Sequence, residues 1–300
     1  MNYREKAIRL GKETPLMAVV TEPPVGTAPS GQGVVLLNAG LLHRVGPSRL
    51  NVQMARSLAP LGHVSVRFDF SGIGDSEARR DGLPFERSSV LEVQDAMAAL
   101  AARGTREFTL AGLCSGADAA FLAALVDTRV TGLVMMDPWI YHTARYRLHH
   151  YLPKVLNAKS WLHLLTGETL MRRVLRPALS KGLPTPQHET NENVVVAHYA
   201  RDFPPRELVQ QQVASLVQRR VRMLNIFSGG MPAHVAYQGQ YRDCFHEIDF
   251  GDLLSEHFDG QAEHIFSALR HQQWVRDLVT AWMTPKVGDV VTPSAVLETV

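Results

Sequence analysis

The sequence is poor in cysteine, in excess charge and in long apolar runs. Its two cysteines, Cys114 and Cys244, are too few for a disulfide framework, which favours a reducing compartment. A formal net charge of +2 gives no reason to expect a nucleic-acid partner. No segment reaches the roughly 18 consecutive apolar residues of a membrane span, and residues 1–6 lack the apolar core of a signal peptide. We therefore expect a cytoplasmic protein without a membrane span.

Apolar residues make up 45% of the chain, enough for one large core, and they fall into alternating strand and helix patterns. Short apolar runs predict strands at 6–10, 16–21, 34–37, 64–68, 107–111, 130–136 and 222–227, and a last strand ending near 257–259. Amphipathic segments predict helices starting at Pro47 and Ser115, at 90–102 and 269–282, and near 234–242. This alternation predicts an α/β fold with a mostly parallel sheet flanked by helices.

A sharp turn between a strand and a helix is the strongest single feature. Cys114 lies between the strand that reaches Gly112 and the alanine-rich helix that starts at Ser115. With Gly116 this makes a Gly-x-Cys-x-Gly pattern, in which the glycines let strand and helix pass closely and leave the central side chain prominent. The start of the helix favours a thiolate, and the Ser115 N–H favours a developing oxyanion. The alternative is a buried structural cysteine beside a turn.

This pattern resembles the nucleophile turn of the α/β-hydrolase superfamily, in a minority variant with cysteine in place of serine. The resemblance extends from about Glu5 to Trp282. The stretches 38–46 (NAGLLHRVG) and 67–76 (RFDFSGIGDS) are similar to small bacterial hydrolases found with exosortase systems. The general layout is similar to that of type-I thioesterases. The resemblance implies an α/β-hydrolase fold and an enzyme that acts on acyl groups.

The resemblance also implies the remaining parts of an active site. A second oxyanion donor would come from the backbone N–H of Gly40 or Leu41, and the sequence does not choose between them. The general base would be His264, which follows the last predicted strand and precedes the closing helix. His246 and His257 are the alternatives.

The acid that would orient this histidine is predicted at Asp137, where the strand at 130–136 ends. Carboxyl ends of parallel strands form the ligand-binding edge of such sheets, and type-I thioesterases keep their acid at this position. Many superfamily members place it after a later strand, but the turn that follows 222–227 in this chain is Ser-Gly-Gly-Met and offers no carboxylate. Asp137 could instead only cap the turn at Pro138. In that case Asp249 or Asp252 would be candidates for the acid.

An inserted cap is predicted where the strand and helix alternation stops, over residues 141–220. This stretch has helix-period segments, at 159–165 and 208–217, and proline-bearing breaks. We expect it to be helical and to shape the substrate pocket above the sheet. The core domain would then consist of residues 1–140 and 221–300.

No cofactor or metal is expected. The glycines of Asp69–Ser76 do not match a nucleotide-binding fingerprint, so this stretch is interpreted as a structural turn beside the site. His142, His149 and His150 fall in the predicted cap, where histidines are more often hydrogen-bonded locally than bound to a metal.

Three functions remain open from the sequence. The first is a thioesterase or esterase that passes through a Cys114 acyl intermediate, with a small ester or thioester substrate that a carrier protein or coenzyme A could present. The second is an acyltransferase or condensing enzyme on the same three residues, since a thioester intermediate is open to attack by acceptors other than water. The third is a hydrolase-like binding protein without activity.

Overall fold

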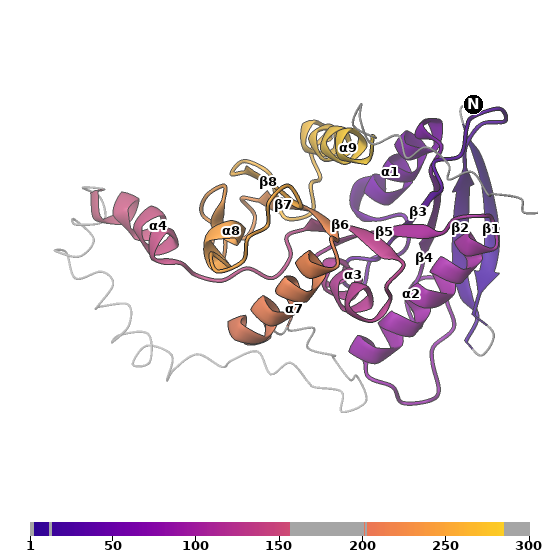
Figure 1. Ribbon diagram of the computed structural model, residues 1–300, viewed down its shortest axis with the longest axis horizontal. Helices are drawn as coiled ribbons and strands as arrows, with labels where there is room; N and C mark the ends of the chain where they lie inside the picture. The colour runs from indigo at the N-terminus through magenta and orange to yellow at the C-terminus, as the bar shows by residue number, and fades with distance from the viewer. Residues whose placement is uncertain (1–2, 12–13, 157–200, 202, 285–300) are drawn as a thin grey trace, which may run out of the picture.

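The chain is organised around one sheet of eight strands, as seen in a computed structural model that describes residues 3–11, 14–156, 201 and 203–284. The strands are β1 (Arg4–Leu10), β2 (Leu16–Glu22), β3 (Gln32–Leu36), β4 (Val64–Phe68), β5 (Glu107–Leu113), β6 (Val130–Met136), β7 (Arg222–Ser228) and β8 (Leu254–Asp259). Their order is β1-β2-β4-β3-β5-β6-β7-β8 (Figure 1). The pairs β1–β2 and β2–β4 are antiparallel and all others are parallel, so the predicted mostly parallel sheet is confirmed.

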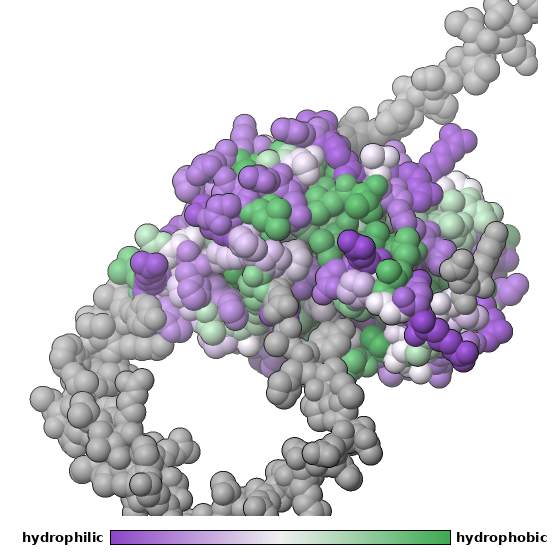
Figure 2. Space-filling model, turned by 90° about the horizontal axis from the view of Figure 1, so that it is seen from below, coloured by the Kyte–Doolittle hydropathy of each residue, from purple (hydrophilic) through white to green (hydrophobic). Residues whose placement is uncertain are grey.

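Helices cover both faces of this sheet. They are α1 (Leu50–Leu58), α2 (Phe85–Ala101), α3 (Ser115–Val126), α4 (Ala144–Leu156), α7 (Arg206–Gln218), α8 (Gln240–Cys244) and α9 (Leu269–Met283). Figure 1 shows α1 and α9 on one side of the sheet and α2, α3 and α7 on the other, with α4 and α8 beyond the β7–β8 edge. Figure 2 looks at the molecule from the side of α2, α3 and α7, where apolar areas alternate with polar ones.

Alternation of side chains along the central strands builds two cores, one on each face. Val34 and Leu36 of β3 pack with α1 and α9, whereas Val35 packs on the opposite face with α2 and α3. The same change of face separates Val134 from Leu133 on β6. Each such buried side chain stabilises the fold by about 1.5–3 kcal/mol. The continuous apolar runs in the sequence thus reflect burial on both faces.

Two predicted helices differ from the observed ones because of local backbone geometry. The helix expected from Pro47 begins at Leu50, after a short 3-10 turn in which Ser48 and Arg49 have positive φ angles of 47° and 66°. The helix expected near 234–242 is reduced to α8, since Gly239 takes a left-handed φ of 93° directly before Gln240. A left-handed residue interrupts the regular hydrogen-bond ladder of a helix.

The predicted cap is described only at its two ends. Residues 157–200, including the helix expected at 159–165, lie outside the described residues. At the C-terminal end, α7 buries Val209, Val213 and Leu216 in the same core as α3. The division into core and cap therefore remains a prediction. In the described part of the chain, no helix combines the length and the apolar character that crossing a membrane requires.

Candidate active site

The turn between β5 and α3 has the strained geometry that its sequence predicts. Cys114 has φ 55° and ψ −121°, a conformation that costs a non-glycine residue about 1–3 kcal/mol. A Cβ atom on Gly112 would lie 2.2 Å from the carbonyl carbon of Gly116, and one on Gly116 would lie 2.3 Å from the carbonyl oxygen of Asn38. Both flanking positions therefore require glycine, and the thiol is left partly exposed.

Three residues predicted from the sequence meet at the carboxyl ends of the strands. Nδ1 of His264, in the loop between β8 and α9, lies 2.7 Å from Oδ2 of Asp137, which follows β6. The imidazole of His264 also interacts with Cys114, since each of the two side chains shifts the pKa of the other. The three side chains thus form a continuous line from thiol to carboxylate.

The predicted alternatives to His264 and Asp137 have other environments. His257 lies within β8 and is paired in register with Ile226 of β7. The carboxylate of Asp249 accepts the N–H of Gly251 at 3.0 Å. Asp252 forms an ion pair with Arg220 at 3.8 Å on the surface. Neither of these carboxylates is the partner of His264.

The line of three residues shifts the proton affinities of its members. The hydrogen bond to Asp137, followed by that to Cys114, raises the pKa of His264 to about 9, against the effect of burial. Burial raises the pKa of the Cys114 thiol, but the hydrogen bond to His264 and the charge of Arg201 outweigh it and lower that pKa. Both net shifts favour a thiolate beside an imidazolium, which is the nucleophilic form of a cysteine.

Ser228 is a site residue that the sequence reasoning missed. Asp137 is fully buried, and its Oδ1 accepts the N–H of Ser228 at 2.8 Å. The hydroxyl of Ser228 donates to Oδ2 at 2.7 Å, the same oxygen that faces His264. Ser228 is the last residue of β7, and nothing in the sequence around it marks it as the partner of Asp137. The end of β7 thus supplies two hydrogen-bond donors to an acid that directly follows the neighbouring strand β6.

Gly229 and Gly230 allow the turn that follows β7 to pack closely against the loop that carries His264. A Cβ on Gly229 would lie 2.0 Å from the carbonyl oxygen of Gly260, and one on Gly230 would lie 2.2 Å from the backbone nitrogen of His264. Distances this short exclude any side chain at either position.

The predicted oxyanion donors lie around the same turn. The N–H of Ser115 directly follows Cys114 and helps to lower the pKa of its thiol, and the N–H of Gly40 donates to the hydroxyl of Ser115 at 2.8 Å. Leu41 is 73% exposed beside it. Gly40 has a positive φ of 52°, and nothing lies within 4 Å of where its Cβ would be, so the backbone here is open to a ligand. The Ser115 hydroxyl has to rotate before the Gly40 N–H can meet a substrate oxygen.

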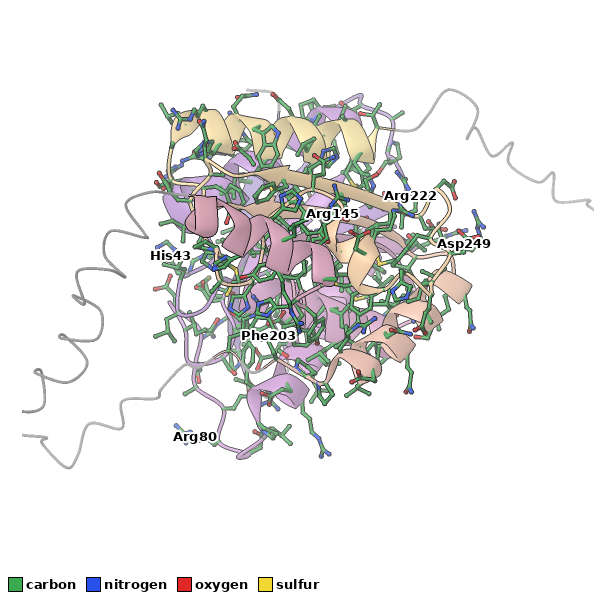
Figure 3. All side chains as sticks on the ribbon, turned by 90° about the vertical axis from the view of Figure 1, so that its left-hand side faces the viewer. His43, Arg80, Arg145, Phe203, Arg222 and Asp249 are labelled. Carbon is green, nitrogen blue, oxygen red and sulfur yellow. The ribbon has the colours of Figure 1, made fainter. Side chains whose placement is uncertain are left out.

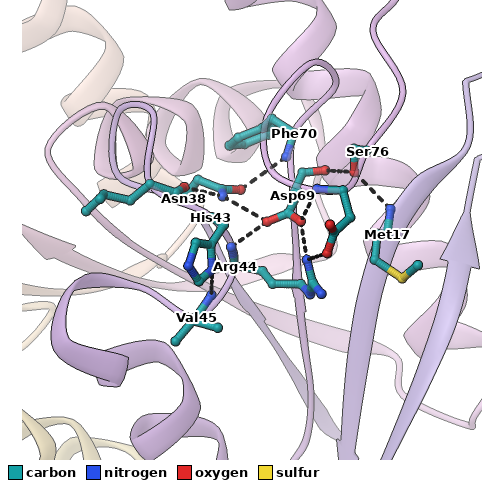
Figure 4. A network of polar contacts seen from close by, with 10 residues as sticks. Met17, Asn38, His43, Arg44, Val45, Asp69, Phe70 and Ser76 are labelled. Carbon is teal, nitrogen blue, oxygen red and sulfur yellow. Dashed lines mark hydrogen bonds and ion pairs between the residues drawn. The ribbon is translucent and has the colours of Figure 1, made fainter.

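A buried polar network holds the loop that carries Gly40 (Figure 4). Asp69 is fully buried and accepts hydrogen bonds from the backbone N–H and the guanidinium of Arg44. Asn38 donates to the carbonyl of Leu42 at 2.6 Å and accepts the N–H of Phe70 at 3.2 Å. The stretch Asp69–Ser76 is thus a turn that supports this loop, as the sequence interpretation had it.

The histidines considered as metal ligands stack on aromatic rings near α4, the helix in front in Figure 3. His142 stacks on Tyr146 at a centroid distance of 4.2 Å, and His150 lies on the same ring at 5.3 Å. His149 stacks on Tyr237 at 5.0 Å. Within the described ranges, no three His, Cys, Asp or Glu side chains gather as a metal site.

The second cysteine has the opposite environment. Cys244 is buried at the end of α8, where its thiol donates to the carbonyl oxygen of Tyr141 at 2.9 Å. Burial raises its pKa to about 12. It therefore remains a thiol at neutral pH.

Comparison with known structures reveals the fold. Over 92% of this chain and 97% of the other, the fold is similar to a proline iminopeptidase of Mycobacterium smegmatis, with 16% identity and a TM-score of 0.55. An α/β serine hydrolase homologue from Coxiella burnetii matches over 94% and 98% of the two chains, with 17% identity and a TM-score of 0.54. An esterase from Pyrococcus furiosus matches over 94% and 92%, with 13% identity and a TM-score of 0.53.

The chain therefore has the α/β-hydrolase fold. At these identities the likeness concerns the fold alone, so the activity has to be argued from the side chains. Neither the protein-family models nor the curated protein sequences contain a match to the chain.

Proposed function

We propose that the protein is an acyl-transfer hydrolase that cleaves an ester or thioester through an acyl group bound to Cys114. The observation that carries this proposal is the line from the Cys114 thiol through His264 to Asp137, with a 2.7 Å contact between the last two. The arrangement follows the nucleophile, base and acid logic of serine hydrolases, with sulfur as the attacking atom.

In the first half of the proposed reaction, the Cys114 thiolate attacks the carbonyl carbon of the substrate. The carbonyl becomes an oxyanion, which the N–H groups of Ser115 and of Gly40 or Leu41 would stabilise. Collapse of this intermediate breaks the bond to the leaving alcohol or thiol. The leaving group takes the proton of the His264 imidazolium, and Cys114 is left as a thioester.

In the second half, His264 is neutral and accepts a proton from water as the water attacks the thioester. The products are a free acid and the restored pair of thiolate and imidazolium. Asp137, held by Ser228, keeps the imidazole in the tautomer that presents its other nitrogen to the sulfur. A single fixed orientation of His264 thus serves both halves of the cycle.

An acyltransferase or condensing reaction is the second candidate, and the sulfur nucleophile favours it. An amine acceptor attacks a thioester more readily, relative to water, than it attacks an oxygen ester. In either reaction the substrate is a small acyl ester or thioester, which a carrier protein or coenzyme A could present. Residues 141–220 would cover its pocket as a cap. Both cysteines are free, in keeping with a reducing cytoplasm.

Mass spectrometry of the intact protein tests the proposal with octanoyl-pantetheine as the probe. The expected result is an octanoyl adduct on Cys114 that decays with release of octanoic acid, and that is absent from Cys114→Ala but present in Cys244→Ala. Decay that yields an amide only when an amine is added would support the acyltransferase. A protein that stays unmodified by this thioester and by p-nitrophenyl octanoate would contradict both and indicate a binding protein.

A further inference from the structure

Arg201 bridges the turn of the nucleophile and the strand end of the acid. Its Nε and Nη2 donate to the two carboxylate oxygens of Asp118 at 2.7 and 2.5 Å, in the forked geometry that only arginine offers. Its Nη1 donates to the carbonyl oxygen of Asp137 at 2.9 Å. The side chains of Arg201 and Asp118 are only 13% and 12% exposed, so solvent screens this bridge weakly.

The two ends of the bridge are attached to the reactive residues themselves. Asp118 lies in the first turn of α3, where its N–H donates to the carbonyl of Cys114 at 3.1 Å. Movement of Asp118 is therefore transmitted to the turn that carries the thiol.

Asp137 is held at each of its polar groups, and Arg201 holds the last of them. Its φ of 48° is unfavourable for a non-glycine residue, so its surroundings must maintain it. Its N–H donates to the carbonyl of Ile226, and its carboxylate is bound by Ser228 and His264. The carbonyl group remains, and the guanidinium of Arg201 binds it.

The charge of Arg201 also acts on the thiol. The pKa of Cys114 is lowered by the hydrogen bond to His264 and then by the positive charge of Arg201, against burial. Burial raises the pKa of Asp118, although its hydrogen bond to Arg201 opposes this shift. The Arg201 side chain lies over the ring of Phe203, with 5.3 Å between guanidinium carbon and ring centroid (Phe203 is labelled in Figure 3).

We propose that Arg201 is a positioning residue, whose guanidinium clamps the first turn of α3 to the Asp137 carbonyl and keeps Cys114, His264 and Asp137 in line. This inference rests on the proposed function, because it assigns Arg201 a part in the same acyl-transfer site. Arg201 touches no reacting atom. It acts through the backbone of Asp137 and through its charge near the sulfur.

The test measures thiol alkylation by iodoacetamide as a function of pH, together with kcat and KM for p-nitrophenyl octanoate. Arg201→Met alone would leave a buried carboxylate unpaired, so the informative variant is Arg201→Met with Asp118→Asn. We expect its alkylation inflection to move to higher pH and its kcat to fall roughly ten- to a hundredfold, as for a lost hydrogen bond to a charged group. KM should change little. Arg201→Lys, which retains the charge but not the fork, should keep the inflection near that of the wild type and restore part of kcat.

Arg219, the residue that follows α7, provides a matched control because it binds the opposite end of α3. It donates to the carbonyls of Ala124 at 2.6 Å and Asp127 at 2.9 Å, at the end of α3 that is remote from Cys114. Arg219→Met should lower the melting temperature without moving the alkylation inflection. An equal shift of the inflection in Arg219→Met would overturn the inference, since it would show that loosening α3 anywhere has the same effect.

A wild-type inflection and wild-type kcat in the double variant would also overturn it. The two proposals fail separately, because alkylation needs no substrate. Absence of turnover in the wild type would contradict the proposed function, while the alkylation profiles would still show whether Arg201 acts on Cys114. Turnover in the wild type that stays the same when Arg201 is replaced would contradict only the positioning role of Arg201, not the proposed function.

Discussion

The two cysteines of this chain occupy contrasting regions of one molecule. Cys114 lies at the strained turn between β5 and α3, partly exposed and in contact with an imidazole whose pKa is raised to about 9. Cys244 ends a short helix, buried against the carbonyl of Tyr141, with its own pKa raised to about 12. The same side chain thus has a lowered pKa in one place, which favours the thiolate, and a raised pKa in the other, which favours the thiol. The difference lies in the neighbours that the fold supplies.

Exchanging each cysteine for alanine should separate the two roles most widely. Cys114→Ala should reduce hydrolysis of p-nitrophenyl octanoate by roughly 10⁵-fold or more, because the nucleophile is lost. Cys244→Ala should retain the activity and lose about 1–2 kcal/mol of unfolding free energy, since a buried sulfur leaves a small cavity. Kinetics and urea unfolding of both variants measure this. If Cys114→Ala retained its activity, the proposed difference in function between Cys114 and Cys244 would be contradicted.

Asp137→Asn should make the environment of Cys114 more like that of Cys244. Without the carboxylate, His264 loses its main source of proton affinity and its fixed tautomer. We expect kcat to fall about 10³- to 10⁴-fold while the fold is retained. The check is kcat together with the melting temperature. Unchanged kinetics would transfer the acid role to another carboxylate.

Ser228→Ala should have a smaller effect of the same kind. The variant removes the hydroxyl bond to Asp137 but leaves the backbone bond in place. We expect the unfolding free energy to fall by about 1–3 kcal/mol, because a buried carboxylate loses one hydrogen-bond donor. We expect kcat to fall about tenfold. Ser215→Ala, which removes a hydroxyl that donates within α7, is the matched control and should leave kcat unchanged.

The smallest expected effect is the pH dependence of the unfolding free energy. His264 and Cys244 contribute to it over different pH ranges, so the two regions can be told apart. The pKa of His264 rises on folding from 6.5 to about 9, so its contribution is complete below pH 6.5 and is lost as the pH rises through 9. The pKa of Cys244 rises on folding from 9.0 to about 12, because burial favours the neutral thiol. The unfolding free energy therefore falls further as the pH rises above 9. Urea midpoints between pH 6 and 10 should show His264→Gln flattening the first window and Cys244→Ala the second. If the change of the urea midpoint between pH 6.5 and 9 were the same in His264→Gln as in the wild type, the raised pKa of His264 would be contradicted.

The parts of the site that the sequence predicted are those encoded within a few residues. Gly112, Cys114 and Gly116 form one turn whose glycines are required by steric contact, and the pattern is visible without a structure. Asp137 was predicted because it directly follows a strand at the carboxyl edge of a parallel sheet. His264 was predicted because the resemblance to the α/β-hydrolase superfamily places the base between the last strand and the closing helix. The strands themselves were predicted from apolar runs, which burial on both faces produces.

Other parts depended on pairing between distant segments. Ser228 reaches Asp137 across 91 residues, because β7 lies beside β6 in the sheet, and nothing local to either residue indicates it. Arg201 joins Asp118 across 83 residues and lies between the helix-period segments at 159–165 and 208–217, where the sequence predicts no strand or helix. The hydrogen bond from the Gly40 N–H to the Ser115 hydroxyl likewise depends on how the loop after β3 meets the start of α3.

The sequence by itself determined the mostly parallel sheet, the strained cysteine turn and the places of Asp137 and His264 in chain order, because backbone sterics and apolar periodicity are local properties. Only the tertiary structure decided which donors hold Asp137, which cation lowers the pKa of the Cys114 thiol and why the pKa of Cys244 is raised instead. Those outcomes depend on the order of strands and the packing of loops, through which residues far apart in sequence come within hydrogen-bond distance.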